Sequence, residues 1–376
     1  MKKQSIPTSS IVFTEEKEQI KQEEQIKTIT LTAIGDIMCH NTQYKDAYQA
    51  SSGSYDFAYV FEDIAPLFEN RDVVIGNLET TFAGAERGYS SYPTFNTPEE
   101  LANDLKELGV DVVSTANNHS LDTGYSGLVS TLDILDQAGI SHMGTYRSQE
   151  EQNQVLIKDI NGLRVAFLSF TYGTNGIPIP SGKDYCINLI DTSLISSQIE
   201  KAKEQNSDII IANMHWGIEY RTTPTNQQEE LADFLFQNGV DIILGSHPHV
   251  LEPMELKEVS LEGGTKKTGF VIYSLGNFMS GQTKENTRDS IILNLTISKK
   301  GNNPITIDEI SYVPIYCYTA NGNFKEYKLL DIQKNIKKFN ETGSCLIPSS
   351  KISFFEAELE KITNLMDSKM KASNEI

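Results

Sequence analysis

From residue 28 onward, the sequence alternates between short apolar segments and longer segments whose apolar residues recur every three or four positions. Residues 29–34 and 72–75 are typical of buried strands, whereas the apolar positions within 57–68 follow the spacing of a helix. Asn161-Gly162, between the apolar segments 155–160 and 163–170, predicts a β-hairpin. Strands that alternate with helices and are followed by hairpins predict an α/β fold, built as a layered sandwich of mixed sheets.

The same patterns predict further elements along the chain. Proline is tolerated in the first turn of a helix, so Pro98 is expected to open a helix that runs to Leu108. Another helix is expected after Gly124, where leucines recur on one face. The remaining predicted helices cover 195–202 and 227–236, and the remaining predicted strands cover 111–114, 208–212, 241–244, 269–275 and 290–297.

Three regions are expected. Residues 1–27 are predicted to be a charged N-terminal tail or stalk; a solvated helix is the alternative, and the stalk is favoured because few of these residues are apolar. Residues 28–300 are predicted to form the main domain. Residues 301–376 are predicted to be an irregular C-terminal extension that packs on this domain and ends in a charged helix over 354–370.

Composition narrows the classes of function. The chain has 51 acidic against 32 basic residues, a net charge of -19, so nucleic acid is not an expected partner. The four cysteines are scattered and form no CxxC pair, so neither a disulfide scaffold nor a thiolate metal site is expected. No apolar run approaches the ~18 residues of a membrane span, and residues 4–10 are too polar for a signal peptide. These features predict either a cytoplasmic protein or one whose anchor lies outside this sequence.

Residue types that bind metal ions follow the ends of five predicted strands. In an α/β sheet, ligands bind beyond the carboxyl ends of the strands, so these positions are candidates for one site. Five of the six histidines fall in these loops. The loops are Gly35-Asp36-Ile37-Met38-Cys39-His40, Asn77-Leu78-Glu79, Asn117-Asn118-His119, His215-Trp216-Gly217 and Gly245-Ser246-His247-Pro248-His249.

Each candidate alone has a structural explanation. Asp36 suits a turn or helix cap, Glu79 an exposed acid, Asn118 a turn and His215 a core histidine. The His247-Pro248-His249 segment is harder to explain structurally. Proline disfavours helical backbone at the preceding residue, and in extended backbone two residues that are two apart point the same way. The five loops together therefore predict a metal site, whereas His142 lies outside them and is expected to be structural.

The ligand types indicate which ions would bind. Mixed aspartate, glutamate, asparagine and histidine ligands without cysteine suit Mn²⁺, Zn²⁺ or iron. Six or seven candidate ligands exceed the needs of one ion. Two ions about 3.5–4 Å apart that share a bridging carboxylate would use them all.

The order of these motifs, followed by Tyr273-Ser274-Leu275-Gly276-Asn277-Phe278, resembles the CapA family of bacterial capsule and poly-γ-glutamate biosynthesis proteins. That family is similar to the calcineurin-like metallophosphoesterases, and the resemblance covers about residues 28–300. It implies two mixed β-sheets flanked by helices, with a dinuclear metal site at the strand ends. Asp36 and His249 would hold one ion, and Asn118, His215 and His247 would hold the other. Glu79 would bridge the two ions.

The resemblance also implies a general acid. His119 corresponds to the histidine that protonates the leaving oxygen in phosphoesterases, and Asp122 is close enough in sequence to orient it. The alternative for Asp122 is a helix N-cap. One position departs from the pattern, because Met38 occupies the place of a histidine ligand in the Asp-x-His motif, and a thioether is a poor ligand for these ions. His40 is a candidate replacement ligand.

The function implied is that of a metal-dependent hydrolase of capsule or poly-γ-glutamate biosynthesis, acting on a phosphoester or an anionic polymer. Membrane-bound polyglutamate synthase subunits are the implied partners, and the extracytoplasmic cell envelope is the implied location. Two alternatives remain open. The first is a non-catalytic envelope component of a synthase complex, and the second is a phosphodiesterase that acts on another substrate.

Overall fold

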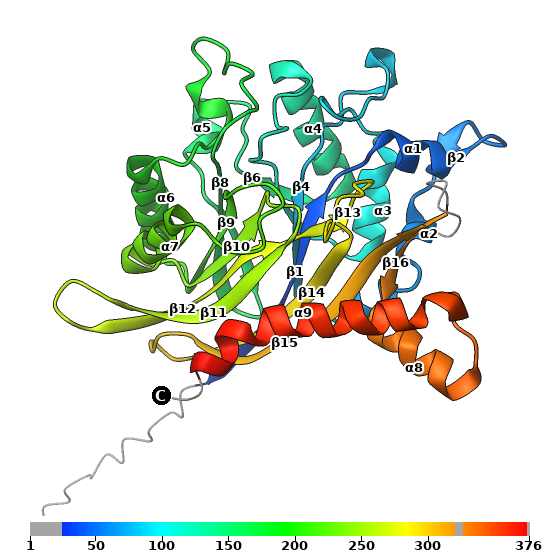
Figure 1. Ribbon diagram of the computed structural model, residues 1–376. Coiled ribbons are helices and arrows are strands. Elements are labelled where there is room, and N and C mark those ends of the chain that lie inside the picture. The colour runs from blue at the N-terminus through cyan, green and yellow to red at the C-terminus, as the bar shows by residue number, and fades with distance from the viewer. Residues whose placement is uncertain (1–24, 320–325, 374–376) are drawn as a thin grey trace, which may run out of the picture.

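The computed structural model describes residues 25–319 and 326–373, and the predicted N-terminal tail lies almost entirely outside the described residues. The described chain contains two large β-sheets packed face to face, with helices on their outer faces (Figure 1). Both sheets contain parallel and antiparallel pairs. The predicted sandwich of two mixed β-sheets flanked by helices is confirmed.

The first sheet has the strand order β16-β15-β14-β1-β4-β5-β6, with β13 also paired to β1. Parallel pairing of β1 with β4 and with β13 sends three chain segments toward the same edge. The bounds are β1 Ile26–Ile37, β4 Val73–Leu78, β5 Val112–Ser114, β6 Ser141–Met143, β13 Asn277–Met279, β14 Asp289–Lys300, β15 Thr306–Thr319 and β16 Tyr327–Asp331.

The second sheet has the order β11-β12-β10-β9-β8-β7, and the predicted hairpin at Asn161-Gly162 joins β7 to β8. The central strands β8, β9 and β10 are parallel and almost fully buried, as expected for strands covered on both faces. The bounds are β7 Leu156–Ile160, β8 Leu163–Thr171, β9 Ile209–His215, β10 Ile242–Ser246, β11 Leu251–Ser260 and β12 Lys266–Leu275, and the short strands β2 Tyr48–Gln49 and β3 Ser54–Tyr55 form a separate pair.

Helices cover both outer faces, so the core has three apolar layers. The first sheet packs against α1, α2 and α3, and the second packs against α6 and α7 (Figure 1). Between the sheets, residues of β1 such as Leu31 and residues of β9 such as Ile211 belong to one buried apolar cluster. The helices are α1 Asn41–Ala47, α2 Ala58–Phe61, α3 Glu100–Leu108, α4 Gly124–Ala138, α5 Gln149–Gln152, α6 Thr192–Glu204, α7 Asn226–Asn238, α8 Ile332–Thr342 and α9 Ile352–Ser373.

The expectation of an irregular segment after residue 300 was wrong. β15 and β16 extend the first sheet, and α9 places Phe355, Ile362 and Met366 in the core between the sheets. The strand signal in β15 is weak because its first half is polar and exposed, and because Pro314 interrupts it. Proline is tolerated there because it lies one residue beyond the pairing of β15 with β16, which begins at Ile315.

The two sheets share one edge at which strands from both of them end. β1 and β4 of the first sheet end there, as do β9 and β10 of the second. β1 begins at Ile26, so the end of the expected tail is already part of this strand. None of the described helices is long and apolar enough to cross a membrane.

Candidate metal centre

Asp36 lies at the end of β1, where the chain passes very close to its neighbour. Gly35 is required there, because a Cβ atom at this residue would lie 2.0 Å from the carbonyl oxygen of Gly276. The Asp36 backbone N–H donates to that carbonyl at 2.8 Å. The fully buried Asp36 carboxylate accepts from Asn77 Nδ2 at 2.8 Å and lies 3.2 Å from His249 Nδ1. Close strand packing therefore fixes the position of this carboxylate.

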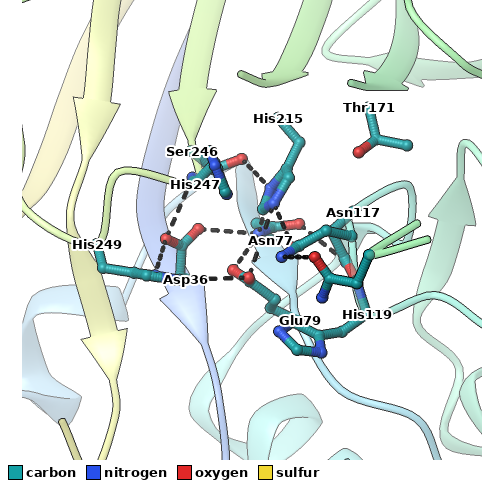
Figure 2. A network of polar contacts seen from close by, with 12 residues as sticks. Asp36, Asn77, Glu79, Asn117, His119, Thr171, His215, Ser246, His247 and His249 are labelled. Atoms are coloured by element: carbon teal, nitrogen blue, oxygen red, sulfur yellow. Dashed lines mark hydrogen bonds and ion pairs between the residues drawn. The ribbon is translucent and has the colours of Figure 1, made fainter. Parts of the chain in front are cut away.

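Asn77 connects the candidates, although the sequence motifs alone did not identify it as a site residue. Its side-chain nitrogen lies 2.8 Å from Asp36 Oδ1, 3.3 Å from Glu79 Oε2 and 3.4 Å from His215 Nδ1 (Figure 2). A buried asparagine inside the apolar strand β4 was the available signal, since such a group must find partners. Asn77 therefore orients one residue from each of three candidate loops.

Glu79 is fully buried directly after β4 and is positioned by its backbone N–H, which donates to Ile37 at 2.9 Å. Within the described residues, its Oε1 atom has no hydrogen-bond partner. That oxygen lies 3.7 Å from His215 Nε2 and 3.8 Å from His249 Nε2. Burial, with additional repulsion from Asp36, raises the pKa of the Glu79 carboxyl well above its usual range. A cation placed beside Oε1 would relieve both effects.

His215 ends β9 and faces Asn118. His215 Nε2 lies 2.8 Å from Asn118 Oδ1, and Nδ1 lies 3.1 Å from Ser246 Oγ. The amide nitrogen of Asn118 donates to Asn175 Oδ1 at 3.1 Å, which turns the Asn118 oxygen toward His215. Burial lowers the pKa of His215 well below its usual value, so its ring is neutral, as a metal ligand must be.

The His247-Pro248-His249 segment brings its two rings together by a route that differs from the expected one. The prediction of extended backbone was wrong, because φ is 98° at His247 and 59° at His249. The loop instead curls around Asp36, which accepts from the His247 backbone N–H at 3.4 Å. The centroids of the two rings are 6.0 Å apart, and that of His247 is 4.8 Å from that of His215. Burial lowers the pKa of His247 to about 3.

The hydrogen bonds of His249 define which nitrogen it offers. Its Nδ1 lies 3.2 Å from Asp36 Oδ2 and 3.1 Å from Asn277 Oδ1. Because both neighbours are oxygen acceptors, Nδ1 carries the proton and Nε2 keeps the lone pair that faces Glu79. The hydrogen bond to Asp36 therefore fixes the orientation of the His249 ring.

His119 and Asp122 form a buried pair next to this cluster. His119 Nδ1 lies 2.7 Å from Asp122 Oδ2, and the same oxygen accepts from the Phe95 backbone N–H at 2.6 Å. The ring of Phe95 packs edge-on against His119. Thr123, not Asp122, is the residue that caps α4. Asp122 therefore orients His119 and leaves its Nε2 atom as the nitrogen that can exchange a proton.

Among the described residues, the side-chain atoms that could bind a metal ion form three overlapping groups, and the atoms of each group lie within 4.8 Å of one another. Each group shares one residue with each of the others. Two contain the predicted ligands alone, and the third contains Glu219, which the sequence motifs did not single out as a site residue. The groups are Glu79, His215 and His247; Asp36, Glu79 and His249; and Glu219, His247 and His249.

Two further residues lie at the margin of the cluster. His40 belongs to none of the groups found among the described residues, and its Nδ1 accepts from the Gly281 backbone N–H at 3.0 Å. Met38 is buried in the position after β1 where the resemblance expects a histidine. His142 lies outside the cluster, 3.2 Å from Asp136.

Glu252 provides a test of how burial controls a carboxylate outside the ligand groups. Its side chain is fully buried and accepts from Gln228 Nε2 at 2.7 Å. Burial raises its pKa to about 7, so the folded state binds its proton more tightly than the unfolded state does. The contribution of this proton to the free energy of unfolding is therefore complete below about pH 4.3, and it is lost as the pH rises to about 7.

We expect Glu252→Gln to remove this pH dependence. At pH 8 the variant should be more stable than the wild type by about 2–4 kcal/mol, with a smaller difference at pH 5. Urea denaturation of both proteins at the two pH values measures the difference. An equal difference at pH 5 and pH 8 would show that Glu252 titrates normally.

Together these observations define a class of protein: a layered α/β sandwich with a buried cluster of nitrogen and oxygen donors where the strands of its two sheets end. The chain belongs to the family described as bacterial capsule synthesis protein PGA_cap, whose model matches residues 30–282. The predicted resemblance to CapA proteins is thereby confirmed.

Individual relatives agree with this family. The chain is 30% identical over 310 residues to the capsule biosynthesis protein CapA of Bacillus anthracis, covering 79% of this chain and 71% of that protein. It is 29% identical over 296 residues to the PGA biosynthesis protein CapA of Bacillus subtilis, covering 76% and 74%. Among solved structures, the calcineurin-like phosphoesterase YfkN from Bacillus subtilis has a TM-score of 0.47 and 15% identity, covering 88% of this chain and 100% of that chain.

Proposed function

We propose that this protein is a metal-dependent hydrolase of capsule or poly-γ-glutamate biosynthesis. The observation that carries the proposal is the environment of Glu79 Oε1. This buried oxygen has no hydrogen-bond partner within the described residues and lies between His215 Nε2 and His249 Nε2, at 3.7 and 3.8 Å. An anionic oxygen between two imidazole nitrogens is an arrangement that a divalent cation stabilises.

The residues present fit two divalent ions. Glu79 and His249 are proposed to hold one ion together with Asp36, and Glu79, Asn118, His215 and His247 to hold the other. Nitrogen and oxygen donors without thiolate suit Mn²⁺, Zn²⁺ or iron. When bound, such ions lower the pKa of a water molecule and neutralise charge that develops on the substrate.

The neighbouring side chains are proposed to position the substrate and move a proton. The Nδ1 proton of His119 is held by Asp122, so its Nε2 atom is available to protonate a leaving oxygen or nitrogen. Asn77 holds Asp36 and Glu79 in place through one amide group. Burial of the cluster excludes competing water from these groups.

The biological setting is proposed from the relatives. Two of them are described as capsule or PGA biosynthesis proteins, and a Mycobacterium tuberculosis relative is described as a probable polyglutamine synthesis accessory protein. A phosphoester or an anionic γ-glutamyl polymer is therefore the proposed substrate class. Subunits of a membrane-bound polymer synthase are the proposed partners, and the cell envelope is the proposed location.

We expect the protein loaded with Mn²⁺ or Zn²⁺ to hydrolyse either model phosphodiesters or γ-glutamyl peptides, because the same site can activate water against both bonds. A chelator should abolish this activity, and adding the metal back should restore it. The screen measures product release with each substrate before and after chelation. Absence of metal-dependent turnover on every substrate would favour a non-catalytic role in a synthase complex.

A further inference from the structure

Glu219 lies on the solvent side of the candidate metal centre. It follows β9 by four residues, and its exposed carboxylate comes within 4.8 Å of donor nitrogens of His247 and His249. Each of these histidines also belongs to one group that contains Glu79: His247 with His215, and His249 with Asp36. Glu219 is therefore the exposed member of a ligand set whose other members are buried.

The segment that carries Glu219 is fixed to the His247–His249 loop on both sides. The Trp216 backbone N–H donates to Ser246 at 3.1 Å, and that of Tyr220 donates to Pro248 at 2.7 Å. The buried indole of Trp216 also donates to the Tyr273 carbonyl at 2.9 Å. These bonds hold the backbone on either side of Glu219 against the two histidines.

A second observation points to a ligand at this position. The Nδ1 atom of His247 is buried and has no hydrogen-bond partner in the part of the chain that the structure describes, and the whole residue is only 4% exposed. An imidazole nitrogen buried without a partner is costly unless an ion or a water molecule binds it. His247 belongs to the group that contains Glu219, and one of its ring nitrogens has no hydrogen-bond partner among the described residues.

The ion proposed at His249 has few donor atoms among the predicted residues. Met38 offers no hard donor, and Asp36 Oδ2 already contacts His249 Nδ1 and the His247 backbone N–H. The ion proposed at His249 therefore has two carboxylates among the predicted residues, Glu79 and Asp36, and both oxygens of Asp36 also contact neighbouring nitrogens. A further carboxylate from outside this set would complete its coordination.

We propose that Glu219 is a metal ligand, and that it completes the coordination of the ion bound by His249. This inference rests on the proposed function, because it requires that the cluster binds divalent ions. If an ion binds there, Glu219 would supply its ligand on the solvent side.

The test is a calorimetric titration of the metal-free protein with Mn²⁺. We expect two binding steps in the wild type and, in Glu219→Gln, about 10–100-fold weaker affinity in one step with the other unchanged. The matched control is Glu262→Gln, another exposed glutamate, which lies in the turn between β11 and β12, at the far end of the strand that begins two residues after His249. The control should titrate like the wild type.

Glu79→Gln separates failure of this inference from failure of the proposed function. If Glu219→Gln titrates like the wild type while Glu79→Gln loses Mn²⁺ binding, Glu219 is not a ligand and the metal centre stands. If the wild type binds no Mn²⁺, both proposals are overturned. Weakening of one step by Glu219→Gln but not by Glu262→Gln supports the assignment.

Discussion

Replacing Glu79 by glutamine is expected to remove bound metal and increase the stability of the metal-free protein. Its Oε1 atom lies between His215 and His249, so loss of the carboxylate should weaken the binding of both ions by at least about 100-fold. Burial and the nearby Asp36 raise the pKa of this carboxyl, so folding without an ion must either bury its charge or bind a proton, and the neutral amide avoids this cost.

Two measurements test the expected loss of metal and the expected gain in stability. Elemental analysis after dialysis should find metal in the wild type and little in Glu79→Gln. Thermal unfolding should show that added Mn²⁺ stabilises the wild type but not Glu79→Gln, by about 2.7 kcal/mol for each bound ion when the free ion is at 100 times its Kd. Glu252→Gln is the matched control, because Glu252 is also fully buried, and among the described residues its Oε1 has no hydrogen-bond partner and it belongs to none of the ligand groups. Equal metal content in all three proteins would remove Glu79 from the centre.

His119→Ala is expected to reduce turnover by about 10²–10⁴-fold while leaving metal content unchanged, because a general acid contributes a factor of that size without binding an ion. The Asp122 partner holds the Nδ1 proton of this histidine at 2.7 Å, which leaves Nε2 for proton transfer. Steady-state kinetics with the best substrate and elemental analysis of the same sample measure the two quantities.

His142→Ala is the control for this substitution, since His142 pairs with Asp136 outside the cluster. It should keep both turnover and metal. A His119→Ala protein with wild-type turnover would exclude a role in proton transfer. A variant that loses its metal would make His119 a ligand instead.

Much of the fold follows from local patterns. Apolar strands such as β9 and β10 are buried on both faces, so their hydrophobicity identifies them, and Asn161-Gly162 identifies one hairpin. The ends of these strands also indicate where the ligands gather, because parallel strands end at one edge. Five of the predicted ligands lie at that edge in Figure 2: Asp36, Glu79, His215, His247 and His249. Asn118 lies there too, with its side-chain oxygen 2.8 Å from His215 Nε2.

The remainder depends on tertiary contacts that local patterns do not encode. β15 has an exposed polar half and becomes a strand because β14 offers it an edge to pair with. Positive φ angles at His247 and His249 arise because their loop must wrap around Asp36. Asn77 lies in a candidate loop but was not predicted to be a site residue, and Glu219 lies just beyond the His215-Trp216-Gly217 loop; their contacts with the other loops appear only in the folded structure.

The most direct test of the metal centre is a crystal structure of the Mn²⁺-loaded protein, with the ions located by their anomalous scattering. We predict two peaks about 3.5–4 Å apart on either side of Glu79, one bonded to His215 and the other to His249. Peaks only at the protein surface, or no peak within bonding distance of Glu79, would contradict the assignment.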